Sequence, residues 1–326
     1  MIVLTDSDVG ALLTPAMAFD AVAAVMQRVS AGAAQLPLRH VVPVGGPNLM
    51  GVMSGALDDP ACYGAKLLSL FPGNPARGLS GHRGAVVLFD PDTGAPVAMI
   101  DAGCLTALRT AAASAVATDA LARADAARLV LIGTGEQAEY HLHAIARIRP
   151  LTAVHVVGRR AGKATGFAGL AAARYPGLEM THGTDVQAGV RGADIICTVT
   201  NAAEPVLLGE WLEPGQHLNI VGASVPSKRE IDAEVLRRAS VFCDYRPSFE
   251  AQAGELAALR AEGDLPQGLL RGEIGAVLSG TLPGRQAPEE ITLYRSLGIM
   301  AQDLAVGWQA MEAANAQGTG QRVAFP

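Results

Sequence analysis

The feature that most restricts the fold is a glycine-containing loop at 133–138, between an apolar run and a helical segment. The loop residues are Gly133, Thr134, Gly135, Glu136, Gln137 and Ala138. They fit the pattern GxGxxA, in which the first glycine allows a tight turn and the second lets the backbone approach a pyrophosphate. The pattern is weak in a chain with 37 glycines, but its position after RLVLI and before a helix is the required context. The loop therefore predicts dinucleotide binding at a helix N-terminus.

Around this loop, apolar runs alternate with helical segments from residue 128 to about 280. Four runs are typical of buried parallel strands, and the segments between them of crossover helices. The runs are RLVLIGTG at 128–135, AVHVVGRR at 153–160, DIICTVT at 194–200 and HLNIVGA at 217–223. This alternation predicts an α/β domain of the Rossmann type.

The N-terminal third has a different pattern. A capped helix is expected at 14–30, followed by apolar runs separated by turn signals, which predict a mostly antiparallel sheet. These runs are 39–44, 49–54, 62–71 and 85–89, and a small-residue helix follows at 106–123. A last long helix is expected at 292–317, packing on the N-terminal sheet. The predicted domains are therefore 1–117 with 297–326, and 118–296.

Charge and composition exclude several functions. The 25 Lys and Arg against 31 Asp and Glu give a net charge of −6, which argues against nucleic acid as a partner. The four cysteines lie far apart without metal-ligand spacing, so no metal is expected. No apolar run approaches the roughly 18 residues of a membrane span, and the acidic N-terminus is unlike a secretory signal. We expect a cytoplasmic protein without a membrane partner.

The end of the second predicted strand indicates which cofactor is preferred. An acidic residue there would bind the ribose 2′-hydroxyl of NAD. This chain has Gly158, Arg159 and Arg160 instead, and two guanidiniums suit a 2′-phosphate. NADPH is therefore favoured and NADH remains possible, although solvated arginines at a strand end would look the same.

Three cations in the N-terminal region suggest a carboxylate-binding pocket. Lys66 interrupts an apolar strand, where it is either a solvated edge residue or a desolvated lysine with a lowered pKa. Arg109 lies in the first turns of a helix, where a cation opposes the macrodipole and an anionic ligand would explain it. Arg39 alone would be interpreted as a surface residue.

Five segments carry a family resemblance that covers nearly the whole chain. They are GAKLLSLFPGNPARG, LTALRTAAAS, LVLIGTGEQA, GASVPSKREID and YRSLGIMAQDLA. The chain resembles the ornithine cyclodeaminase/mu-crystallin family, and most closely its ketimine (pyrroline-2-carboxylate) reductase members. The resemblance implies a Rossmann domain inserted into an α+β domain for substrate binding and dimerisation, and hence a homodimer.

The resemblance also assigns roles to residues. It implies that Arg39, Lys66 and Arg109 hold a substrate carboxylate and that Thr110 contacts the cofactor phosphate. Lys66 is the expected proton donor, because a group with a pKa near neutrality transfers protons efficiently in both directions. Thr200 and Asn201, which follow the third strand, complete the expected cofactor-binding set with the loop at 133–137 and the two arginines.

One departure bears on the reaction. Ornithine cyclodeaminases resemble GGDCPGKTE where this chain has GASVPSKRE, so Ser224 replaces an aspartate that handles the substrate amine. Ser224 is expected to orient substrate or water. The resemblance then implies NAD(P)H-dependent reduction of a C=N bond in an imino acid, such as Δ1-pyrroline-2-carboxylate or Δ1-piperideine-2-carboxylate, to the L-amino acid.

Alternatives stay open. The chain could be an ornithine cyclodeaminase, an alanine-type amino-acid dehydrogenase, or a non-catalytic binder of NADPH and a small acid like mu-crystallin. His82 is either a surface residue or a second acid, and Asp303 is either a pocket residue or a helix cap.

Overall fold

The computed structural model describes residues 1–263 and 265–324. The chain forms two compact units, Met1–Arg109 with Ile299–Pro326, and Thr110–Gly298. The predicted division falls at 117/118 and 296/297, whereas the units divide at 109/110, inside a continuous helix, and at 298/299. Residues 325 and 326 of the predicted range lie outside the described residues. The assignment of one unit to substrate and the other to cofactor stays a prediction.

The first unit is built on an eight-stranded sheet of order β16-β1-β7-β6-β5-β4-β2, with β3 paired to β4. All its neighbouring strands run antiparallel except the pair β1 and β7, in agreement with the mostly antiparallel prediction. The strands are β1 (Ile2–Leu4), β2 (Ala34–Gln35), β3 (His40–Pro43), β4 (Leu49–Asp58), β5 (Ala61–Leu70), β6 (His82–Phe89), β7 (Pro96–Asp101) and β16 (Gln321–Arg322). Its helical segments are α1 (Asp6–Leu12), α2 (Pro15–Ser30), η1 (Asn74–Arg77), the start of α3 (Ala102–Leu121) and α11 (Met300–Gln317).

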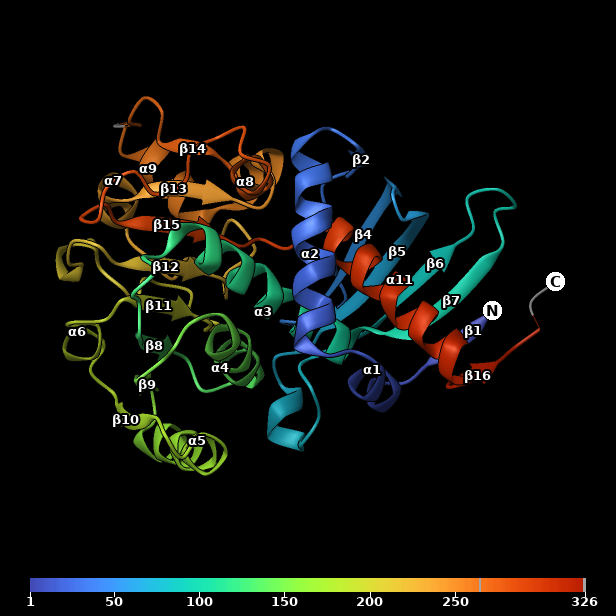
Figure 1. The fold of residues 1–326 in the computed structure, drawn as a ribbon, viewed down its shortest axis with the longest axis horizontal. Helices are drawn as coiled ribbons and strands as arrows, with labels where there is room; N and C mark the ends of the chain where they lie inside the picture. The colour runs from blue at the N-terminus through green and yellow to red at the C-terminus, as the bar shows by residue number, and fades with distance from the viewer. Residues whose placement is uncertain (264, 325–326) are drawn as a thin grey trace. The chain divides into compact units, whose positions relative to one another are not determined.

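Helix α2 forms where the sequence predicts it. The Thr14 hydroxyl accepts a hydrogen bond from the Met17 amide at 3.2 Å, and Pro15 occupies the first turn, where its missing N–H costs nothing. Its buried face carries Ala18, Val22, Val25, Met26 and Val29, at helical spacing. This face packs beside α11, which in turn lies against β4, β5 and β6 (Figure 1).

The predicted helix at 292–317 is wrong in its first part. Residues Thr292–Arg295 form the buried strand β15, and α11 begins only at Met300. The run ITLYR is apolar, β-branched and aromatic, which favours a strand fully covered on both faces. Gly298, with φ at +76°, then breaks the chain direction before the helix starts.

The second unit contains an eight-stranded sheet of order β10-β9-β8-β11-β12-β15-β13-β14, parallel throughout. The strands are β8 (Arg128–Ile132), β9 (Ala153–Val157), β10 (Glu179–Gly183), β11 (Ile195–Thr198), β12 (His217–Ile220), β13 (Ser240–Cys243), β14 (Leu270–Glu273) and β15. The remaining helices are α4 (Glu136–Ile148), α5 (Ala161–Arg174), α6 (Val186–Gly189), η2 (Gly209–Trp211), α7 (Ala233–Arg238), α8 (Arg246–Gln252), α9 (Gly254–Ala261) and α10 (Ile274–Leu278). All four strands predicted in this region are present, which confirms the Rossmann-type α/β fold.

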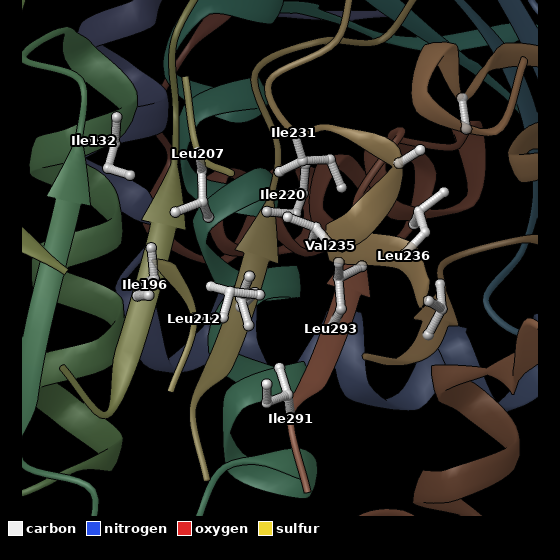
Figure 2. Packing of buried hydrophobic residues seen from close by; sticks show 14 of the residues in the cluster. Ile132, Ile196, Leu207, Leu212, Ile220, Ile231, Val235, Leu236, Ile291 and Leu293 are labelled. Atoms are coloured by element: carbon white, nitrogen blue, oxygen red, sulfur yellow. The ribbon is translucent and has the colours of Figure 1, made fainter. Parts of the chain in front are cut away.

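A large hydrophobic cluster holds the strands of this unit to the segments that cover one face (Figure 2). Ile196, Ile220 and Leu293 come from three adjacent strands, and Val235 and Leu236 come from α7. These side chains are fully buried, so replacing one by alanine would leave a cavity and cost about 2–5 kcal/mol.

Among the described residues, no single helix has the length and apolar character to cross a membrane, and only α1 and α2 taken together, bent by 87°, meet that test.

Candidate functional site

The loop between β8 and α4 lies at the carboxyl edge of the parallel sheet, at the point where the strand order reverses. From β8 the chain passes to β9 and β10 on one side, and later to β11 and β12 on the other. Ligands of open α/β sheets bind at such a switch point. The second unit therefore presents its glycine loop at the expected ligand-binding edge.

The loop geometry requires glycine and fits a pyrophosphate. Gly133 has φ of +130°, and a Cβ there would lie 2.7 Å from the Val199 carbonyl oxygen. Gly135 is the N-cap of α4 and supplies no side-chain cap, while a Cβ on it would meet nothing within 4 Å. The N-terminus of this 13-residue helix has no side-chain cap from Gly135, and no side chain of that residue stands between it and a ligand. Such a helix start is the arrangement that binds phosphate groups.

The two arginines of the second strand follow β9. Gly158 is closely packed, since a Cβ there would come within 2.7 Å of Thr134 Cγ2. Arg159 and Arg160 are exposed, and Arg160 is the N-cap residue before α5. Both guanidiniums are thus on the surface beside the glycine loop, where a solvated role and a phosphate-binding role are both compatible with their placement.

Glu230 ties together the loops that follow β11 and β12, and sequence reasoning missed it. Its fully buried carboxylate accepts hydrogen bonds from Thr198 Oγ1 (2.9 Å), from the amide and hydroxyl of Thr200 (2.6 and 2.7 Å), and from the Gly222 amide (2.5 Å) and Ala223 amide (3.3 Å). Asn201 accepts from Lys228 Nζ at 2.6 Å. The loop of Thr200 and Asn201 is therefore fixed to the loop that carries Ser224.

A buried ion pair also supports the Ser224 loop from within the sheet. Arg295, fully buried on β15, donates to the Ala223 carbonyl at 2.6 Å and the Ile220 carbonyl at 3.0 Å, and pairs with buried Glu255. Ser224 itself is half-buried in the segment after β12. The structure places Ser224, Thr200 and Asn201 at the same edge of the parallel sheet as the glycine loop.

Lys66 has a buried ion partner in the first unit. It lies on β5 between β4 and β6, with 1% of its surface exposed, so the interpretation as a solvated edge residue is wrong. Its Nζ donates to Asp303 Oδ1 on α11 at 2.8 Å and to Thr106 Oγ1 on α3 at 2.7 Å. A helix-cap role for Asp303 is also wrong, because Ile299 is the N-cap of α11 and the Asp303 carboxylate binds the lysine.

Arg109 shares the same carboxylate. Its Nε donates to Asp303 Oδ1 at 3.2 Å, and its Nη1 donates to Gln302 Oε1 at 3.1 Å. Arg109 is 6% exposed and Asp303 is fully buried. We call Lys66, Arg109 and Asp303 the buried ion cluster.

Electrostatics make this cluster unusual. Burial lowers the pKa of Lys66 to about 8; Asp303 opposes this shift, while the charges of Arg109 and Arg39 add to it. Burial alone would raise the pKa of Asp303, but Arg109 and Lys66 outweigh burial and lower it. A lysine in this range can give up or take a proton near neutrality, and the excess positive charge attracts a carboxylate.

The structure gives the positions of three other candidate residues, Arg39, Thr110 and His82. Arg39 is half-buried and lies near enough to act on the Lys66 pKa. Thr110 is buried next to Arg109 on α3. His82 is exposed at the start of β6, where its backbone carbonyl accepts from the Ser80 hydroxyl at 2.8 Å.

Fold and sites together define a dinucleotide-binding α/β protein with a buried cationic cluster on a separate sheet. The chain belongs to the ornithine cyclodeaminase/mu-crystallin family, which it matches over residues 1–318. The family resemblance found in the sequence is thereby confirmed.

Relatives of known name and structure match most or all of the chain. The ketimine reductase mu-crystallin of Mus musculus is 36% identical over 279 residues, 84% of this chain and 83% of that protein. The Δ1-pyrroline-2-carboxylate reductase of Thermococcus litoralis, solved with NADH and L-proline, is 30% identical with a TM-score of 0.95, covering 99% of this chain and 100% of that one. An archaeal alanine dehydrogenase dimer with bound NAD is also 30% identical, with a TM-score of 0.93, covering 100% and 99%.

Proposed function

We propose that this protein reduces the C=N bond of an imino acid, a cyclic ketimine such as Δ1-pyrroline-2-carboxylate or Δ1-piperideine-2-carboxylate, to the L-amino acid. The observation that carries the proposal is the buried ion cluster. In it Lys66, with a pKa of about 8, and Arg109 share the carboxylate of Asp303, so the cluster has one positive charge in excess. The mouse relative is a ketimine reductase, and the Thermococcus relative was solved with NADH and L-proline.

In this proposal the cations of the first unit bind and protonate the substrate. Arg109 and Arg39 hold the substrate carboxylate, because a guanidinium matches a carboxylate with two parallel N–H groups. Lys66 uses two of its three N–H groups on Asp303 and Thr106, and the third reaches the substrate. Lys66 gives a proton to the imine nitrogen as the α-carbon gains a hydride, so that C=N becomes CH–NH.

The second unit binds the reduced nicotinamide cofactor, which supplies the hydride when bound. Gly133 to Gln137 hold the pyrophosphate, and Thr110 contacts a cofactor phosphate. Arg159 and Arg160 favour NADPH by pairing with its 2′-phosphate, although relatives of this fold bind NAD and NADH. The linked loops of Thr200, Asn201 and Ser224 would hold the nicotinamide half of the cofactor, and Ser224 would orient the substrate or a water.

We further infer that the protein is a homodimer through the first sheet. Successive residues of β5 alternate between faces, so Tyr63 and Leu67 lie opposite Lys66, and both are exposed. Val42 on β3 and Met99 on β7 are exposed on the same face of this sheet. An apolar sheet face of this kind indicates a protein interface, and the archaeal alanine dehydrogenase relative is a dimer.

The test is NADPH and NADH consumption, followed by absorbance, with a panel of cyclic imino acids and with pyruvate plus ammonia or methylamine. Reduction of a cyclic imine, lowered by orders of magnitude in Lys66→Ala and Arg109→Ala, supports the proposal. Ammonia release from L-ornithine without net cofactor turnover would identify a cyclodeaminase instead. Turnover restricted to pyruvate and ammonia would identify an alanine-type dehydrogenase, and cofactor binding without any turnover would identify a binding protein.

A further inference from the structure

We propose that Asp303 is a positioning residue for the proton transfer: it fixes the direction of the Lys66 ammonium and keeps that group charged in its apolar surroundings. The inference deepens the proposed function and rests on it. Asp303 does not touch the substrate in this view, and it acts only through Lys66 and Arg109.

The first support is the sharing of one oxygen atom. Asp303 Oδ1 accepts hydrogen bonds from both Lys66 Nζ (2.8 Å) and Arg109 Nε (3.2 Å), so one oxygen atom fixes the positions of both cations. Together with Thr106 at 2.7 Å, this contact fixes two of the three ammonium N–H directions. The direction of the third is then determined by the tetrahedral geometry of the nitrogen, as a proton donor requires.

The second support is the state of the other carboxylate oxygen. Asp303 Oδ2 is buried and has no hydrogen-bond partner among the described residues. A carboxylate that merely anchored α11 would spread its hydrogen bonds over backbone or side-chain donors, as Asp244 does with the Leu297 and Gly298 amides at 2.8 and 2.6 Å. The negative charge of Asp303 is instead directed at the two cations.

The third support is the balance of charges around Lys66. Three charged side chains act on it: Asp303 from α11, Arg109 from α3, and Arg39 from the segment before β3. Two are positive and disfavour the ammonium, as does burial, while Asp303 alone favours it. Without Asp303 the Lys66 ammonium would lose its proton at a lower pH. The imine nitrogen would then have no proton donor above that pH.

The experiment compares Asp303→Asn with wild type across pH, using NADPH or NADH and the best cyclic imine. Reduction needs the charged lysine, so kcat/KM of the wild type falls above a pH of about 8. In Asp303→Asn this decline is expected at least about one pH unit lower, since a nearby opposite charge shifts a pKa by about 1–3 units. At pH 8 kcat/KM falls about fivefold or more, mainly in kcat. Asp303→Glu, which keeps the charge, restores the wild-type profile in part, and Asp20→Asn on the exposed face of α2 leaves it unchanged.

A purely structural role predicts a different result. If Asp303→Asn lowers kcat/KM by the same factor at every pH, with the decline still near pH 8, the inference is wrong. If this variant does not fold, Gln302→Glu decides, because it adds a carboxylate beside Arg109 and should move the decline to higher pH; no movement there also refutes the inference.

Failure of the proposed function can be distinguished from failure of the role given to Asp303. If the wild type reduces no imine, that function is wrong, and binding of L-proline measured by calorimetry takes the place of turnover. Proton uptake on binding should then reach its maximum at a lower pH in Asp303→Asn than in wild type. Identical maxima would overturn the role of Asp303 by themselves.

Discussion

Replacing Glu230 by glutamine should destabilise the second unit, although the two side chains have nearly the same shape. Both carboxylate oxygens accept a backbone N–H: Oε1 accepts that of Thr200, and Oε2 accepts those of Gly222 and Ala223. A glutamine amide has one oxygen and one NH₂ group. Whichever way the amide is turned, its NH₂ faces at least one backbone N–H that then has no acceptor.

The magnitude follows from the less harmful orientation. With the NH₂ group in the place of Oε1, only the Thr200 amide loses its partner, because the Thr200 hydroxyl can rotate and accept. One buried unsatisfied N–H costs about 1–3 kcal/mol, and the remaining bonds lose the strengthening of a charged acceptor. We therefore expect Glu230→Gln to lower the free energy of unfolding by about 2–4 kcal/mol.

The assay is urea unfolding of both proteins followed by circular dichroism, with Glu204→Gln as control. The side chain of Glu204 is 82% exposed, and its contact with Arg229 is a surface pair at 3.7 Å, so the control should unfold like wild type. Binding of NADH, measured by fluorescence, should weaken in Glu230→Gln, because the loops it links border the proposed nicotinamide site. A free energy of unfolding within about 0.5 kcal/mol of wild type would refute the reasoning.

Four other predictions concern the cofactor, acid stability and assembly. Arg159→Ala should raise the KM for NADPH and leave that for NADH nearly unchanged; equal effects on both would show that Arg159 does not contact the 2′-phosphate. Gly133→Ala should abolish cofactor binding because its Cβ would lie 2.7 Å from a carbonyl oxygen at a φ of +130°, whereas Gly169→Ala, whose Cβ meets nothing within 4 Å, should bind normally in the same titration. Burial lowers the pKa of His141 to about 4, so the unfolded chain binds more protons between about pH 6.5 and 4, and stability should fall as pH decreases through this range, by roughly 2–3 kcal/mol from this group. His141→Gln should flatten that part of the unfolding profile, and an unchanged slope would contradict the assignment. Leu67→Glu should produce monomers in analytical ultracentrifugation, and a dimer of wild-type affinity would exclude the exposed sheet face as the interface.

The parts of this fold that could be predicted from the sequence are those with local causes. The glycine loop is determined by its own backbone, because Gly133 needs a positive φ and Gly135 lies open at a helix start. The buried parallel strands appear as short apolar runs at regular intervals. The run ITLYR was the exception, since a short apolar segment directly before a long helix has no periodicity that separates strand from helix.

The partners of buried charges could not be predicted, because they come from distant parts of the chain. Lys66 and Asp303 are 237 positions apart, and nothing near either residue indicates the other. A signal was nevertheless present: Asp303 lies within the apolar segment SLGIMAQDLA, and a carboxylate on a buried helix face requires a cation. Glu255, in GELAALRA, follows the same rule with Arg295. The rule identifies which charges need partners, and only the fold shows which pairs form.

The composition of the buried ion cluster bears on the kind of substrate it suits. It contains two cations and one anion, an excess of one positive charge in surroundings that disfavour charge. One substrate carboxylate beside Arg109 balances this excess while Lys66 remains charged. In the proposed reaction Lys66 becomes neutral when its proton passes to the imine nitrogen, while Arg109 and Arg39 still hold the carboxylate of the product. Asp303 then favours return of a proton to Lys66, because its negative charge stabilises the ammonium, and the recharged lysine can serve the next imino acid.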